Sequence, residues 1–173
     1  MTSPKELLLI DANIISHALT SNQTAAYVKL FEELEQTYKF VVTGYTKYEI
    51  MCSSDKDHRE KIEEYLEQNM GYITLSKPLM DFAARLCFLY GKHSSTKGQR
   101  ITNGDVVNAA FSIAKPCALL TIDSNDYPRP FFAEVTRHRI TYISKTNREN
   151  TDIAYVLSPD VDHVRECFEK HEV

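Results

Sequence analysis

Short apolar runs alternate with longer amphipathic segments along this chain. Leu7–Ile10 is fully apolar, has the length of a buried strand and ends at Asp11. The strongest strand pattern is the uninterrupted apolar run Cys117–Ile122, which leads into a polar turn. The other predicted strands are Phe40–Thr43, Tyr72–Leu75 and a last one at Arg139–Ile143.

The segments between these runs favour helices. Helices are predicted at Asn13–Leu19, Ala25–Tyr38, Asp57–Met70, Pro78–Tyr90 and Asp105–Ala114. Thr46 and Glu49 have the spacing of a capping box, which predicts a further helix that starts there. Ser158 and Pro159 predict the start of a C-terminal helix. The polar segment Lys92–Gly104 is the clearest loop.

Strands that alternate with helices indicate right-handed crossovers and a mainly parallel sheet. We therefore expect a three-layer α/β/α fold, with helices on both faces of the sheet. In such sheets the functional crevice lies beyond the carboxyl ends of the strands. The 173 residues correspond to about one domain.

Composition narrows the classes of partner. Hydrophobic residues make up 43% and charged residues 25%, which is typical of a globular protein and excludes a disordered one. The net charge of −4 argues against a protein that coats nucleic acid by bulk charge. The apolar runs are too short for a signal peptide or a membrane span, so we expect a cytoplasmic protein with no membrane partner.

The four cysteines form no CxxC pair. Most of them have apolar neighbours, which predicts buried free thiols in a reducing compartment rather than a structural zinc site. His163 and Cys167 are one helical turn apart on the predicted C-terminal helix. Such a pair alone indicates packing more often than metal binding.

Acidic residues follow the predicted strands with unusual regularity. Asp11 follows the first strand, Glu49 the second, and Asp123 the strong one, with Asp126 three residues later, while Asp105 opens a helix. Each has a structural explanation as a cap or turn residue. Together they would converge at one end of a parallel sheet, where several carboxylates repel one another. A hard divalent cation such as Mg²⁺ or Mn²⁺ is the natural neutraliser.

This pattern resembles the PIN-domain metal-dependent ribonucleases, which include the VapC-type toxins. The resemblance rests on Leu-Leu-Leu-Ile-Asp11-Ala-Asn13, on Thr43 with Glu49, on Asn-Gly-Asp105 and on Leu-Leu-Thr121-Ile-Asp123-Ser-Asn-Asp126-Tyr127, and spans residues 7–143. It implies hydrolysis of RNA at an acidic pocket that holds Mg²⁺ or Mn²⁺. The catalytic, metal-binding acids would be Asp11, Glu49, Asp105 and Asp123, supported by Asn13, Thr121 and the extra acid Asp126.

The resemblance also implies partners. RNA would be the substrate, a small antitoxin protein would pair with a toxin of this family, and PIN-like proteins often form homodimers. Lys92, Lys97 and Arg100 precede Asp105 and are candidate contacts for an RNA backbone.

Two features depart from a minimal toxin, namely the long segment Lys92–Gly104 and the tail. We therefore expect a PIN-like nuclease domain over residues 1–143 and a C-terminal extension over residues 144–173 that packs on the same domain. The departures leave a second hypothesis open, a non-catalytic PIN-like module that binds RNA or a protein.

Overall fold

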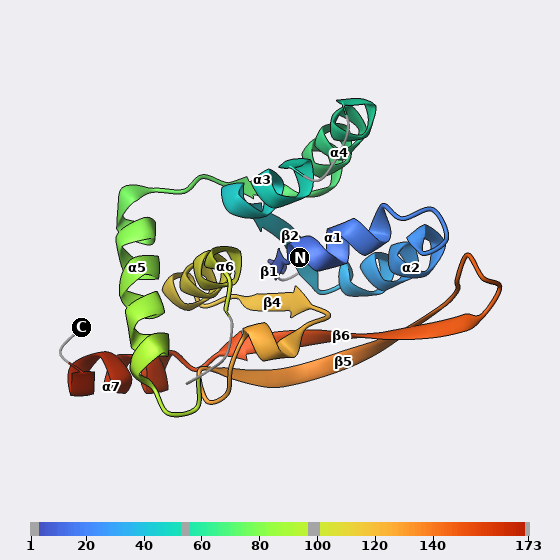
Figure 1. Ribbon diagram of the computed structural model, residues 1–173. Coiled ribbons are helices and arrows are strands. Elements are labelled where there is room, and N and C mark those ends of the chain that lie inside the picture. Colours follow the sequence, from blue (N-terminus) through green and yellow to red (C-terminus); the bar gives the residue numbers. More distant parts are fainter. Residues whose placement is uncertain (1–3, 53–55, 97–100, 172–173) are drawn as a thin grey trace.

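A six-stranded sheet with strand order β3-β2-β1-β4-β6-β5 forms the centre of the protein (Figure 1). The structure is a computed structural model, which describes residues 4–52, 56–96 and 101–171. Its strands are β1 (Glu6–Ile10), β2 (Tyr38–Thr43), β3 (Gly71–Ile73), β4 (Ala118–Thr121), β5 (Phe132–Ile143) and β6 (Glu149–Pro159). Its helices are α1 (Ala12–Ala18), α2 (Thr24–Leu34), α3 (Gly44–Cys52), α4 (Lys56–Asn69), α5 (Lys77–Lys92), α6 (Asn103–Ala114) and α7 (Val161–His171), with a short 3₁₀ turn η1 (Ser124–Asp126).

Strands β1 to β4 pair in parallel, whereas β6 is antiparallel to both β4 and β5. Apolar side chains alternate between the two faces of the sheet, as the buried strand β1 shows. Leu9 packs into a core with α5, α6 and α7, while Leu8 and Ile10 pack into a second core with α1, α2 and α4. The fold is therefore the predicted three-layer α/β/α arrangement with a mainly parallel sheet.

The C-terminal part of the fold differs from the sequence prediction. The strand predicted at Arg139–Ile143 is the end of the longer β5, and it is followed by a further strand, β6. Ser158 and Pro159 end β6 and do not open the last helix, because the Asp160 carboxylate caps α7 by accepting the His163 amide proton at 2.9 Å. Residues 144–173 thus supply a strand inside the sheet as well as α7.

The predicted capping box is also misplaced. Helix α3 begins at Gly44, so Thr46 lies within it and donates its amide proton to Thr43 Oγ1 at 3.2 Å. Glu49 is therefore released from the capping role that the sequence assigned to it.

Two of the four cysteines are also less buried than predicted. Cys117 and Cys167 are buried, but Cys52 and Cys87 are exposed. Among the described residues, no helix has the length and apolar character needed to cross a membrane.

Candidate metal centre

Four carboxylates line one open cleft at the carboxyl ends of the central strands. The cleft has a volume of about 260 Å³. The acids are Asp11, which follows β1, Glu49 on α3, Asp105 on α6 and Asp126 in the turn after β4. Parallel strands bring these ends together, so residues up to 115 positions apart in the sequence share one site.

Asp11 is held by an array of donors. Its Oδ1 caps α1 by accepting the Ala12 amide proton at 2.7 Å, and Asn108 Nδ2 lies 3.4 Å from the same oxygen. Its Oδ2 accepts from Thr121 Oγ1 at 2.8 Å and from Asn13 Nδ2 at 3.0 Å. Burial raises the pKa of Asp11 to about 6, although the Thr121 hydrogen bond opposes the shift.

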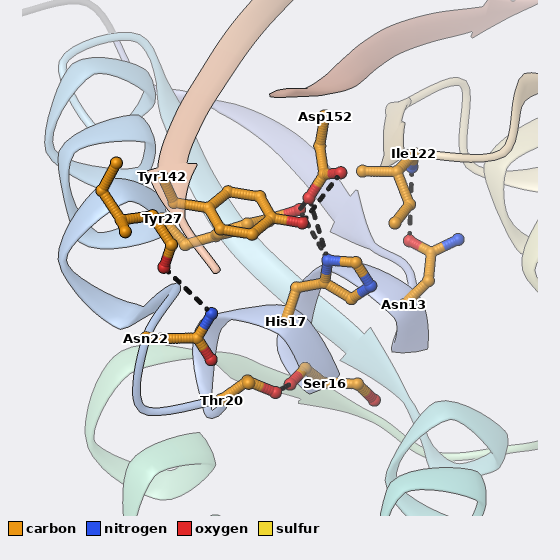
Figure 2. Close-up of polar contacts among 10 residues, drawn as sticks. Asn13, Ser16, His17, Thr20, Asn22, Tyr27, Ile122, Tyr142 and Asp152 are labelled. Carbon is orange, nitrogen blue, oxygen red and sulfur yellow. Dashed lines mark hydrogen bonds and ion pairs between the residues drawn. The ribbon is translucent and has the colours of Figure 1, made fainter. Parts of the chain in front are cut away.

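The two predicted supporting residues therefore lie beside Asp11. Asn13 also accepts the Ile122 amide proton through Oδ1 at 3.3 Å, which fixes α1 to the end of β4 (Figure 2). Thr121 is fully buried and donates directly to the Asp11 carboxylate. Both side chains fix the orientation of the Asp11 carboxylate in the cleft.

Glu49 packs against a glycine. A Cβ atom at position 104 would lie 2.7 Å from both Glu49 carboxylate oxygens, so only Gly104 leaves room for the carboxylate where it stands. Burial raises the pKa of Glu49 to about 7, and the nearby charges of Asp105 and Asp11 add to the shift. Glu49 has no hydrogen bond to another described residue that would fix it for structural reasons.

Asp105 combines two roles. Its Oδ2 accepts from the Thr102 amide at 2.8 Å and from the Thr102 hydroxyl at 2.7 Å, which completes a capping box at the start of α6. Burial nevertheless raises the pKa of Asp105, with a further contribution from the charge of Asp123. The other oxygen, Oδ1, is available to the cleft.

Asp126, predicted as an extra acid, lines the cleft, whereas Asp123 does not. Asp123 is exposed, and its Oδ1 accepts the Asn125 amide proton at 3.1 Å, which leaves Oδ2 for a cation. Burial raises the pKa of Asp126 to about 7, followed by the charges of Asp105, Asp123 and Asp11. Asp123 therefore affects the site through its negative charge, which raises the pKa values of Asp105 and Asp126, although it does not line the cleft.

Three residues outside the predicted set of acids and supporting side chains also belong to the site, and the sequence pattern singled out neither Thr102 nor Asn108. Thr102 is the N-cap of α6, and its hydroxyl donates to Asp105. Asn108 links Asp11 to the buried Thr43, because its Nδ2 lies 3.4 Å from Asp11 Oδ1 and its Oδ1 accepts from the Thr43 hydroxyl at 2.9 Å. The Tyr127 hydroxyl is buried without a hydrogen-bond partner of ordinary geometry, and burial and the charges of Asp11 and Asp105 raise its pKa. Only the position of Tyr127 beside the last acid hinted at such a role.

The predicted RNA contacts are not confirmed. Lys97 and Arg100 lie outside the described residues. Lys92 is at the end of α5, does not line the cleft, and places its Nζ 5.3 Å from the centre of the Phe88 ring.

The cleft is suited to a hard divalent cation. All four of its acidic side chains offer oxygen donors, and the described residues that line it include no lysine, arginine or histidine. Burial is the main cause of the raised pKa values of Asp11, Glu49 and Asp126, and the repulsion between the carboxylates, which no positive partner in the cleft relieves, adds to it. A cation would remove this cost.

Comparisons with known proteins bear on the fold. The chain matches no protein-family profile, and no curated protein is similar to it in sequence. Among solved structures, it is similar to a chain in the structure of VapBC2 from Rickettsia felis bound to a DNA fragment from their promoter. The TM-score is 0.57 at 18% sequence identity, over 70% of this chain and 90% of that chain. This likeness shows a shared fold and agrees with the predicted three-layer α/β/α arrangement.

Proposed function

We propose that this protein is a ribonuclease that depends on Mg²⁺ or Mn²⁺ and hydrolyses RNA phosphodiester bonds at the acidic cleft. The observation that carries the proposal is the convergence of Asp11, Glu49, Asp105 and Asp126 on one opening with no basic side chain among them. Buried carboxylates that serve a structural role normally have a cation or a hydrogen-bond donor as a partner. Asp11 and Asp105 have such donors, whereas Glu49 and Asp126 have none among the described residues.

The residues of the cleft would have different roles in metal binding. Asp11, oriented by Thr121 and Asn13, and Glu49, free of structural hydrogen bonds, would be the principal metal ligands. Asp105 would add Oδ1, Asp126 would complete the set, and Asp123 stays a predicted ligand through Oδ2. When bound, the metal supplies an activated water at neutral pH and stabilises the charge that develops on the phosphate.

The structural comparison suggests a protein partner for the proposal. The solved chain that it resembles belongs to a complex named VapBC2, and the sequence resembles a family that includes the VapC-type toxins. We therefore extend the proposal to a toxin that pairs with a small antitoxin protein and that forms a homodimer.

The test is RNA cleavage by the purified protein in Mn²⁺, Mg²⁺ or chelator. Glu49→Gln is the sharpest variant, since it removes a charge but no structural hydrogen bond, and Asp105→Asn is the second. We expect both to lower the cleavage rate by at least about 100-fold. Asp81→Asn, an exposed acid paired with Lys77 on α5, is the matched control and should cleave at the parent rate.

Two outcomes would contradict the proposal. Cleavage that persists in chelator, or parent-level cleavage by Glu49→Gln, would show that the acidic cleft is not the catalytic site. Metal binding by the parent without cleavage of any RNA would favour the second hypothesis, a non-catalytic PIN-like binding module.

A further inference from the structure

A second group of metal-binding side chains lies where α7 crosses the end of α5 (Figure 1). His93 directly follows α5, while His163 and Cys167 occupy successive turns of α7. One ligand atom of each lies within 4.8 Å of the others. None of the three lines the acidic cleft, so this cluster is separate from the proposed nuclease site.

The spacing already approaches that of a metal site. His163 Nε2 lies 3.3 Å from Cys167 Sγ. A nitrogen and a sulfur on one tetrahedral Zn²⁺ lie about 3.5 Å apart, given bond lengths of about 2.0–2.1 Å and 2.3 Å. Since the three ligand atoms lie within 4.8 Å of one another, His93 has to approach by about 1.3–1.4 Å at most, which rotation of its side chain can supply.

Both imidazole rings pack against the same aromatic ring. The fully buried Phe131 lies edge-on to both, with ring centres 4.9 Å from His93 and 5.3 Å from His163. Ser95 Oγ lies 2.7 Å from His93 Nδ1, and the Ser95 amide donates to the same nitrogen at 3.2 Å. While Nδ1 accepts from the Ser95 amide, a neutral ring carries its proton on Nε2. Metal binding through Nε2 therefore requires the proton to move to Nδ1, where the Ser95 hydroxyl can accept it, at the expense of the Ser95 amide hydrogen bond.

The charges around the cluster are mixed. Burial lowers the pKa of His93, and the charges of His163, His171 and Lys170 add to the shift, which places two further positive groups of α7 close to the cluster. Those two positive groups oppose a free cation, whereas a Cys167 thiolate would attract one. His171 follows Cys167 by one further helical turn and, like water, could occupy a fourth position.

We propose that His93, His163 and Cys167 form a second metal site that prefers Zn²⁺ and fastens α7 to the end of α5. Nitrogen and sulfur donors favour zinc over Mg²⁺, in contrast to the oxygen donors of the acidic cleft. On binding, the metal replaces the Cys167 thiol proton, which passes to the solvent. The proposal is independent of nuclease activity.

The test uses Co²⁺ as a spectroscopic probe in the full chain. A cobalt–thiolate charge-transfer band in the near ultraviolet requires a sulfur ligand, so the acidic cleft cannot produce it. We expect the parent to show this band at one equivalent of Co²⁺ and Zn²⁺ to displace it. Cys167→Ser should lose the band, and His93→Gln should weaken Co²⁺ binding by at least about tenfold.

The controls separate the two sites and distinguish Cys167 from Cys87 and Cys117. Cys87→Ser removes an exposed thiol on α5 and Glu49→Gln alters the acidic cleft, so both should keep the band. If Cys167→Ser does not fold, alkylation of the parent gives the answer by peptide mass spectrometry. Zn²⁺ should then slow the modification of Cys167 and leave that of the other buried thiol, Cys117, unchanged. A parent without the band, or a thiol reaction indifferent to Zn²⁺, would overturn the proposal.

Discussion

A single glycine determines where the Glu49 carboxylate can lie. The atom that any larger residue would add at position 104 falls 2.7 Å from both Glu49 oxygens. The obstructing atoms are the end of a flexible side chain, so the carboxylate would move while the backbone stayed in place. Because Gly104 is within α6, its replacement by alanine would not be penalised by the helix itself.

We therefore predict that Gly104→Ala behaves as an active-site variant. RNA cleavage should fall by at least about tenfold, while the free energy of unfolding changes by no more than about 1 kcal/mol. Gly91→Ala on α5 is the matched control, because nothing lies within 4 Å of the added atom. It should stabilise the helix slightly and leave cleavage unchanged. Equal activity of the two variants in a cleavage assay would show that the position of Glu49 is immaterial.

The sequence could identify the acids of the cleft but not their exact arrangement. Asp11, Glu49 and Asp105 are brought together as the strand-end argument predicted. Asp126 lines the cleft and Asp123 does not. In the turn after β4, Asp123 Oδ1 accepts the Asn125 amide proton. The Gly104–Glu49 contact joins two distant helices, so no local pattern could reveal it.

The β5–β6 hairpin is anchored to α1 and α2 by a polar cluster around Asp152. Asp152 Oδ2 accepts from the Tyr27 hydroxyl at 2.8 Å and lies 3.0 Å from His17 Nδ1, and Tyr142 donates to Oδ1 at 3.4 Å (Figure 2). Tyr27 is fully buried, so its hydroxyl depends on this carboxylate and on His17. Helix α1 also carries Asn13, and the cluster therefore supports the helix that Asp11 caps.

We predict that Asp152→Ala lowers the free energy of unfolding by about 1–3 kcal/mol, because it removes the charged acceptor of a buried hydroxyl. Thr151→Ala, an exposed neighbour on the same strand, should change it by less than about 0.5 kcal/mol. Urea unfolding followed by circular dichroism measures both. Indistinguishable midpoints would mean that the Asp152 cluster does not hold the hairpin.

At this scale most of the strands could be predicted from the sequence, but β6 was missed. Residues 149–152 of β6 are polar, whereas residues 153–157 form an apolar run of strand length like those of β1 and β4, and the helix start expected at Ser158 hid it. Its stability comes from pairing with β5 along its whole length and from the Asp152 cluster, which are long-range contacts. Ser158 and Pro159 imitated a helix start at the point where β6 ends.

The acidic cleft affects the stability of the whole molecule. The pKa values of Asp11, Glu49 and Asp126 are raised to about 6, 7 and 7, above their values in an unfolded chain. Between about pH 4 and pH 7 the folded state therefore holds more protons than the unfolded state, and the free energy of unfolding falls as the pH rises. His93, whose pKa is lowered by burial, acts in the opposite direction but is a single group.

We predict that the melting temperature in chelator falls by at least about 3 °C from pH 5 to pH 7.5. Mn²⁺ should restore it, and by more at pH 7.5 than at pH 5, since it competes with protons for the same oxygens. Differential scanning calorimetry measures the change. The double variant Glu49→Gln/Asp126→Asn should show a flatter pH profile, and a parent with the same melting temperature at both pH values would refute this electrostatic account.

The position of β6 between β4 and β5 has a consequence for how the protein is made. A ribosome releases β4 well before residues 149–159, so the nascent chain carries an open sheet edge beside Leu119 and Leu120 until the last strand emerges. Open apolar edges recruit strands from other molecules. The emergence of β6 is thus the step that closes this edge of the sheet, and a chain cut short before residue 149 would expose the β4 edge and be prone to aggregation.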